Sequence, residues 1–121
     1  MKTIASTSLA FLLLGLGGAL AEEPHKDLAA AGHDFALQVC GNCHVVEKGQ
    51  HPAPVLKPPA SSFSAIIARR EVNEAWLRAF LSKPHGNMGR AQKMPNPQLV
   101  DFQIDKIVAY FQQQKKMNKG R

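Results

Sequence analysis

The chain has 121 residues, of which 45% are hydrophobic and 20% are charged, and its formal net charge is +6. This length fits one domain and excludes a repeat array, a transmembrane bundle and a multidomain enzyme. Two cysteines are too few for a disulfide framework, and a single Tyr and a single Trp leave little for stacking on nucleic acid bases. We therefore expect a small basic domain that does not bind nucleic acid.

The first 21 residues have the features of a cleaved export signal. Lys2 precedes a long uncharged apolar stretch, and Ala19-Leu20-Ala21 places small residues at the two positions that a signal peptidase reads. We predict cleavage after Ala21, with residues 22–121 forming one periplasmic domain; an uncleaved membrane anchor is the alternative. Free cysteines in such a compartment oxidise unless another reaction has already modified them.

The first segment after this signal, from Lys26 to Val39, is predicted to be helical. Leu28, Phe35 and Leu37 supply apolar positions among alanines. Gly32 interrupts the helix at a cost of about 1 kcal/mol relative to alanine. That cost is understandable where a second helix crosses closely, so we expect a crossing at Gly32.

The next segment, Cys40-Gly41-Asn42-Cys43-His44, carries the chemistry. The spacing C-x-x-C-H is the attachment signal for c-type haem. Two thiols three positions apart can form thioethers with the two vinyl groups of one porphyrin, and His44 then lies under the ring as an iron ligand. The sequence therefore predicts one covalently bound haem c, with iron, on Cys40, Cys43 and His44.

Two other uses of this cysteine pair fit the sequence less well. A disulfide oxidoreductase would place C-x-x-C after a strand, whereas the segment before Cys40 is alanine-rich and helical. A structural zinc site needs a fourth ligand and usually a second cysteine pair, and the chain has no further cysteine.

Two short helices are expected beyond a loop over residues 45–60, which is rich in Gly and Pro. Ser61 or Ser62 is placed to cap the first, which runs through Arg69. Asn73 is placed to cap the second, from Glu74 to Ser82, which carries Trp76, Leu77, Phe80 and Leu81 on one apolar face.

The iron also needs a ligand on its sixth position. The downstream candidates are Met88, Met94, Met117, His51 and His85. Met94 precedes Pro95-Asn96-Pro97, whose prolines favour an extended loop that can present a thioether to iron. Met88 lies in a glycine-flanked stretch and Met117 in a basic tail. We prefer Met94, with Met88 and a histidine or an open site as alternatives.

The last helix is predicted from about Asp101 to Lys116. Ile104, Ile107, Val108 and Phe111 are spaced to share one face. No strand pattern occurs in the sequence. The predicted fold is all-α, with about four helices packed around one flat apolar prosthetic group.

These motifs together resemble the small class I cytochromes c of bacteria, over nearly all of residues 26–121. The similar segments are Gly32-His33-Asp34-Phe35-Ala36 before the cysteine pair, Pro58-Pro59 after it, and Met94-Pro95-Asn96 before the last helix. The resemblance implies that Pro58 or Pro59 offers its carbonyl to the second nitrogen of His44. It also implies Met94 as the sixth ligand from its distance to Tyr110, although an insertion of about six residues near Met88 departs from the family pattern. At Val100 the family prefers a capping Ser or Thr.

The function that follows is a soluble, monomeric one-electron carrier without enzymatic activity. His/Met ligation fills both axial positions and favours ferrous iron. The positive charge predicts redox partner proteins with acidic docking surfaces. Residues placed to surround the haem edge are Lys48, Lys57, Lys83, Arg90 and Lys93. The alternatives are a haem-bearing subunit of a larger enzyme, and a ligand-binding or peroxidase-like protein with a displaceable methionine.

Overall fold

The computed structural model describes residues 24–83 and 94–120. Their four helices are α1 (Pro24–Val39), α2 (Phe63–Ile67), α3 (Glu74–Ser82) and α4 (Asp101–Lys119). The predicted export signal, with its cleavage site at Ala21, lies outside the described residues. So do Met88, His85, Arg90 and Lys93.

All four predicted helices are present, with small changes at their ends. Helix α1 begins two residues earlier than predicted, α2 stops at Ile67 instead of Arg69, and α4 continues to Lys119. Within the described ranges the only extended pairing is a single bridge between His44 and Ala60. The all-α prediction is confirmed. No helix in the described ranges combines the length and the apolar character needed to cross a membrane.

Side-chain caps explain where the two short helices begin. The Ser62 hydroxyl accepts a hydrogen bond from the Ala65 N–H at 3.2 Å, and the Asn73 side chain accepts one from the Trp76 N–H at 2.9 Å. Val100 has no such group at the start of α4. Instead, the Gln103 side chain accepts a hydrogen bond from the Val100 N–H at 3.1 Å, which satisfies the N–H of the residue that directly precedes the helix.

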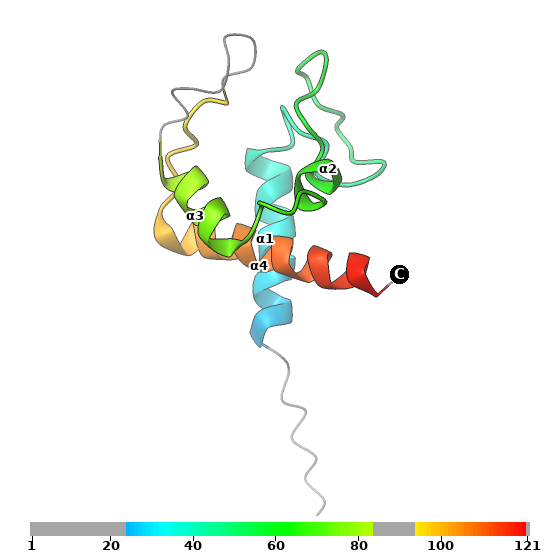
Figure 1. Cartoon of the computed structure of the whole chain (residues 1–121). Helices are drawn as coiled ribbons and strands as arrows, with labels where there is room; N and C mark the ends of the chain where they lie inside the picture. The colour runs from blue at the N-terminus through cyan, green and yellow to red at the C-terminus, as the bar shows by residue number, and fades with distance from the viewer. Residues whose placement is uncertain (1–23, 84–93, 121) are drawn as a thin grey trace, which may run out of the picture.

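Helices α1 and α4 cross one another, and the crossing forms the centre of the molecule (Figure 1). Gly32 lies at the contact. A Cβ atom added there would come within 2.0 Å of the Lys106 carbonyl oxygen. No side chain fits in that space, so the absence of one at Gly32 allows the close approach that the sequence predicts.

The hydrophobic core extends from this crossing to α2 and α3. The Phe63 ring of α2 packs edge-on against Phe111, with ring centroids 5.0 Å apart, and lies 6.4 Å from Tyr110. The large buried core residues are Val46, Phe63, Ile67, Val72, Leu77, Leu81, Ile104, Ile107, Val108, Tyr110 and Phe111. The face of α4 predicted from periodicity is therefore the buried one.

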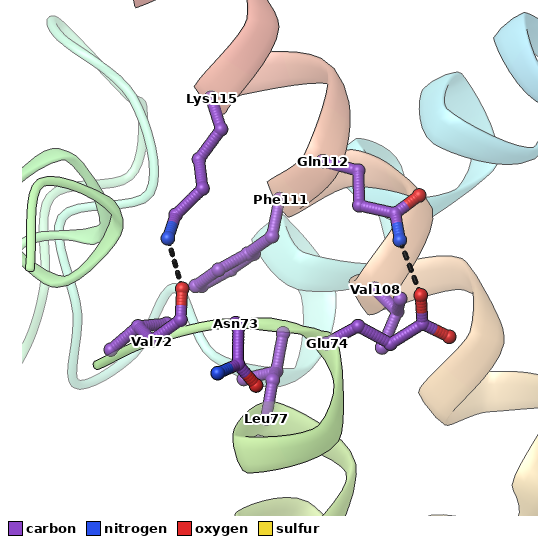
Figure 2. A pocket seen from close by; sticks show the side chains of 8 residues that line it. All are labelled: Val72, Asn73, Glu74, Leu77, Val108, Phe111, Gln112 and Lys115. Atoms are coloured by element: carbon purple, nitrogen blue, oxygen red, sulfur yellow. Dashed lines mark hydrogen bonds between the residues drawn. The ribbon is translucent and has the colours of Figure 1, made fainter. Parts of the chain in front are cut away.

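Polar contacts attach the second half of α4 to the start of α3 and to the segment before it (Figure 2). The Lys115 ammonium donates to the Val72 carbonyl, and the Gln112 amide donates to Glu74 at 2.6 Å. Closer to the start of α4, Arg78 donates to Asp105 at 2.6 Å. These contacts fix α3 and the connection before it along α4.

Candidate functional site

The cysteine motif forms a compact turn that continues from the end of α1. The Cys40 N–H donates to the Ala36 carbonyl at 2.8 Å, and the N–H groups of Cys43 and His44 both donate to the Cys40 carbonyl, at 3.1 and 2.9 Å. This turn holds both thiols and the imidazole within five residues. Gly41 is required inside it, because a Cβ there would lie 2.3 Å from the Leu37 carbonyl oxygen.

Gln50 fastens the following loop to this turn. Its side-chain oxygen accepts a hydrogen bond from the Val46 N–H at 2.6 Å, and its amide nitrogen donates to the carbonyls of Gly41 and His44 at 3.0 and 3.2 Å. Apart from the phenol of Tyr110, Gln50 is the one buried polar side chain among the described residues. Because a buried amide is favourable only when hydrogen-bonded, these contacts specify one arrangement of the turn.

The imidazole of His44 is oriented by a backbone carbonyl. Its Nδ1 lies 2.7 Å from the carbonyl oxygen of Ser61. A carbonyl can only accept, so Nδ1 carries the proton and donates it. In the neutral ring Nε2 is then unprotonated, with its lone pair available to a metal. This is the arrangement in which a metal-binding histidine is held by a hydrogen bond from its other nitrogen.

The prediction that Pro58 or Pro59 offers its carbonyl to the Nδ1 of His44 is wrong, because Ser61 does so. The chain after the loop pairs with the turn: the Ala60 N–H donates to the Cys43 carbonyl at 2.8 Å, and the Phe63 N–H donates to the Val45 carbonyl at 2.9 Å. That register places the Ser61 carbonyl opposite the imidazole. Pro58 and Pro59 precede the pairing and are exposed.

Cys40 faces the apolar interior and packs against the core. Burial, followed by the nearby Cys43, raises the pKa of the Cys40 thiol to about 11. At neutral pH Cys40 is therefore a protonated thiol. Both cysteines are unpaired in the structure, and each is half-buried. Haem attachment requires two thiols that can react with the porphyrin and an imidazole that can bind iron. The turn carries two free thiols beside an oriented imidazole.

The expected sixth ligand is also placed against the core. Met94 is half-buried and packs on the cluster of buried residues, and the segment from Met94 to Val100 runs without helix or strand into α4. His51 is exposed, and Met117, at 49% exposure, lies near the end of α4. Leu77 and Ile107 are buried in the same core, and Phe35, Ile66 and Phe80 are partly buried and pack against that core.

Comparison with known proteins agrees with this site. The family model for cytochrome c matches residues 29–115. The chain belongs to the cytochrome c family. Cytochrome c-552 of Bradyrhizobium diazoefficiens is 36% identical to it over 95 residues, which is 76% of this chain and 83% of that protein. No solved structure shows a significant match. The family is that of the small class I cytochromes c, which carry a covalently bound haem c with iron.

The residues in place fit that cofactor. Cys40, Cys43 and His44 match the C-x-x-C-H motif of the family, and the Nε2 of His44 is left free by the hydrogen bond of Nδ1 to Ser61. Sequence reasoning missed two contributors to this arrangement, the Ser61 carbonyl and the Gln50 side chain. No motif marks a backbone carbonyl. Gln50 lies in a Gly- and Pro-rich loop, where a polar side chain gives no signal of burial.

Proposed function

We propose that the protein carries single electrons between redox proteins through a haem whose iron is held by His44 and Met94. Haem c supplies a one-electron iron couple. The observation that carries the proposal is the hydrogen bond from His44 Nδ1 to the Ser61 carbonyl, at 2.7 Å. It fixes the ring orientation and tautomer, and it raises the basicity of Nε2 as an iron ligand.

Met94 would supply the second iron ligand. Its half-buried thioether packs on the core, and the two prolines that follow keep its segment extended. If His44 and Met94 both held the iron, no coordination position would remain for a substrate. A thioether ligand also favours ferrous iron relative to a second nitrogen. Both consequences belong to electron transfer and not to catalysis on a bound substrate.

Contact with redox partners is expected around the attachment turn. The backbone N–H groups of Val55 and Leu56 both donate to the Asn42 carbonyl, at 2.9 and 3.2 Å, which brings two exposed apolar side chains to this turn. Val39, at 41% exposure, directly precedes Cys40. Such a surface suits brief encounters of small area. The nearby cations Lys48 and Lys57 favour a partner with acidic groups.

We also propose that the protein works in the periplasm after removal of residues 1–21. The apolar segment after Lys2 and the Ala19-Leu20-Ala21 sequence support this location. The intact mass of secreted material should correspond to a chain that begins at Glu22 and bears one haem. A mass that includes Met1 or Lys2 contradicts the cleavage.

Two matched variants test the ligand assignment. Met94→Ala should lower the reduction potential by on the order of 100 mV, since axial ligands set haem potentials over about 0.8 V. It should also change the low-spin ferric absorption spectrum. Met88→Ala should leave the potential and the spectrum unchanged. If Met88→Ala produces these changes and Met94→Ala does not, Met94 is not the ligand.

A further inference from the structure

The buried side chain of Gln50 contacts the attachment turn at three backbone groups. Its amide nitrogen donates to the Gly41 and His44 carbonyls at 3.0 and 3.2 Å, and its oxygen accepts from the Val46 N–H at 2.6 Å. A glutamine amide has two N–H donors, so these two carbonyls can engage both of them. In the part of the chain that the structure describes, no other group donates to either carbonyl. One side chain therefore holds the turn on both sides of the histidine.

The backbone of His44 is fixed at both of its polar groups. Its N–H donates to the Cys40 carbonyl at 2.9 Å, and its carbonyl accepts from the Gln50 amide. With both groups fixed, the bond from Cα to Cβ has one direction, and the imidazole is presented to the Ser61 carbonyl at 2.7 Å. That hydrogen bond makes Nε2 of the ring more basic. The alignment of the His44 ring with Ser61 thus depends on Gln50.

Burial makes the amide of Gln50 difficult to replace. The residue is 7% exposed, so water does not readily take the place of a lost hydrogen bond there. A buried carbonyl without a donor is costly. Removal of the amide should therefore let the turn move until its carbonyls reach water or another donor. The imidazole of His44 moves with the turn, because its backbone carbonyl is one of the two groups released.

We propose that Gln50 is a positioning residue for the iron ligand, and that its amide lowers the reduction potential by preserving the hydrogen bond between His44 and Ser61. A more basic ligand stabilises ferric iron, and hydrogen bonds around an axial ligand are one means by which a protein tunes a haem. Loss of the amide should weaken the bond between His44 and Ser61 and so raise the potential. This inference rests on the proposed role of His44 as an iron ligand, and not on Met94.

Two substitutions of Gln50 and one matched control test this role. Gln50→Leu removes the amide and keeps a side chain of similar size. Gln50→Asn keeps the amide but is one methylene shorter, so it cannot reach the Val46 N–H and both carbonyls together. The control is Val72→Ala, because Val72 is 2% exposed and lines a small cavity with Leu77 and Val108 instead of contacting the turn. Urea unfolding of each holoprotein shows whether the variants lose similar stability.

Two properties of the holoprotein report the position of His44 separately from stability. The reduction potential reports the basicity of the ligand, and the NMR shifts of the haem methyl groups in the ferric protein report the orientation of the imidazole plane. At the midpoint potential of the original protein, Gln50→Leu should raise the ratio of ferrous to ferric protein about threefold, less than the tenfold effects of groups bonded directly to a metal ligand. At about 59 mV for a tenfold change, this rise corresponds to about 28 mV.

The other two variants should differ from Gln50→Leu in a defined way. Gln50→Asn should shift the potential and the haem methyl resonances in the same direction by a smaller amount. Val72→Ala should shift neither, even where it loses as much stability. Unchanged potential and unchanged resonances in Gln50→Leu would overturn the proposal, because Gln50 would then be a purely structural residue. Equal shifts in Val72→Ala would also overturn it, because any loosening of the core would then be sufficient.

Hydrogen exchange in the original holoprotein tests the same contacts without a substitution that could prevent folding. The side-chain N–H groups of Gln50 should exchange with solvent far more slowly than those of Gln98, which is exposed. Equally fast exchange would contradict the hydrogen bonds of Gln50. Absence of an imidazole ligand in the spectrum of the original protein would contradict the proposed function itself, whereas each of the other contradicting results leaves that function in place.

Discussion

The imidazole of His44 contacts the ring of Phe63 edge-on, with ring centroids 5.7 Å apart and planes inclined at 62°. Phe63 is 5% exposed and also packs on Tyr110 and Phe111. The ring that supports the histidine is thus the same ring that joins α2 to α4. Phe63 therefore contributes both to the packing around the His44 imidazole and to the stability of the core.

Phe63→Ala is therefore expected to affect stability and the haem site together. Removal of a buried phenylalanine costs about 3–5 kcal/mol, which is a large share of the stability of a domain this small. Urea unfolding of the holoprotein measures this loss. Phe102→Ala is the control, because Phe102 is 61% exposed and such changes stay within about 0.5 kcal/mol. Equal stability of the two variants would contradict the packing of Phe63 on Tyr110 and Phe111.

Gly32→Ala tests the helix crossing. Alanine is the better helix former by about 1 kcal/mol, but its Cβ would meet the Lys106 carbonyl oxygen at 2.0 Å. Backbone on both sides prevents easy relief, so we expect a net loss of about 1–3 kcal/mol. Thermal unfolding detects this as a clear fall in Tm. Gly120→Ala should have no effect, since its nearest neighbour would lie 3.8 Å away. A stabilised Gly32→Ala variant would show that the helices are farther apart.

Lys115→Gln should destabilise the fold, although it lies on the surface. The ammonium of Lys115 donates to the Val72 carbonyl (Figure 2). It also donates to the Arg69 carbonyl at 3.4 Å, and a shorter amide would leave both carbonyls without this donor. An unsatisfied, partly buried carbonyl costs about 1–3 kcal/mol. Lys116→Gln removes the same charge from an exposed neighbour and should change the free energy of unfolding by less than about 0.5 kcal/mol. Equal effects of the two changes would argue that only charge matters.

Tyr110 should make stability fall at high pH. Burial, followed by the charge of Glu47, raises the pKa of Tyr110 above its ordinary value of 10.0. The folded state therefore holds the phenol proton more tightly than the unfolded state. The resulting stabilisation is fully present below pH 10 and is lost as the pH rises through the folded-state pKa.

The phenolate absorbance reports this titration directly, because Tyr110 is the single tyrosine of the chain. Its midpoint should lie above 10 in the folded protein. Glu47→Gln should lower the midpoint but keep it above 10, since burial is the larger cause. A midpoint at or below 10 in the folded protein would refute the burial of this phenol.

Local signals predicted most of the fold and the covalent part of the site. Periodicity predicted the buried face of α4 and capping side chains predicted the starts of α2 and α3, because both depend on neighbouring residues. Gly32 predicted the crossing, because a glycine inside a helix is favourable where another backbone approaches closely. The partner of His44 Nδ1 was not predictable in this way. It depends on the register between residues 43–45 and 60–63, which involves backbone groups that any sequence carries. The contacts of Gln50 and Lys115 likewise depend on the packing of distant segments.

Carbon monoxide binding to the reduced holoprotein at neutral pH is the most direct test of the proposal that His44 and Met94 both hold the iron. With His44 and Met94 both on the iron, the absorption spectrum of the reduced protein should stay the same when carbon monoxide is added, while a redox titration follows a one-electron curve. A spectrum that changes on addition of carbon monoxide would show an open or displaceable position. The protein would then be a ligand-binding haem protein and not a simple electron carrier.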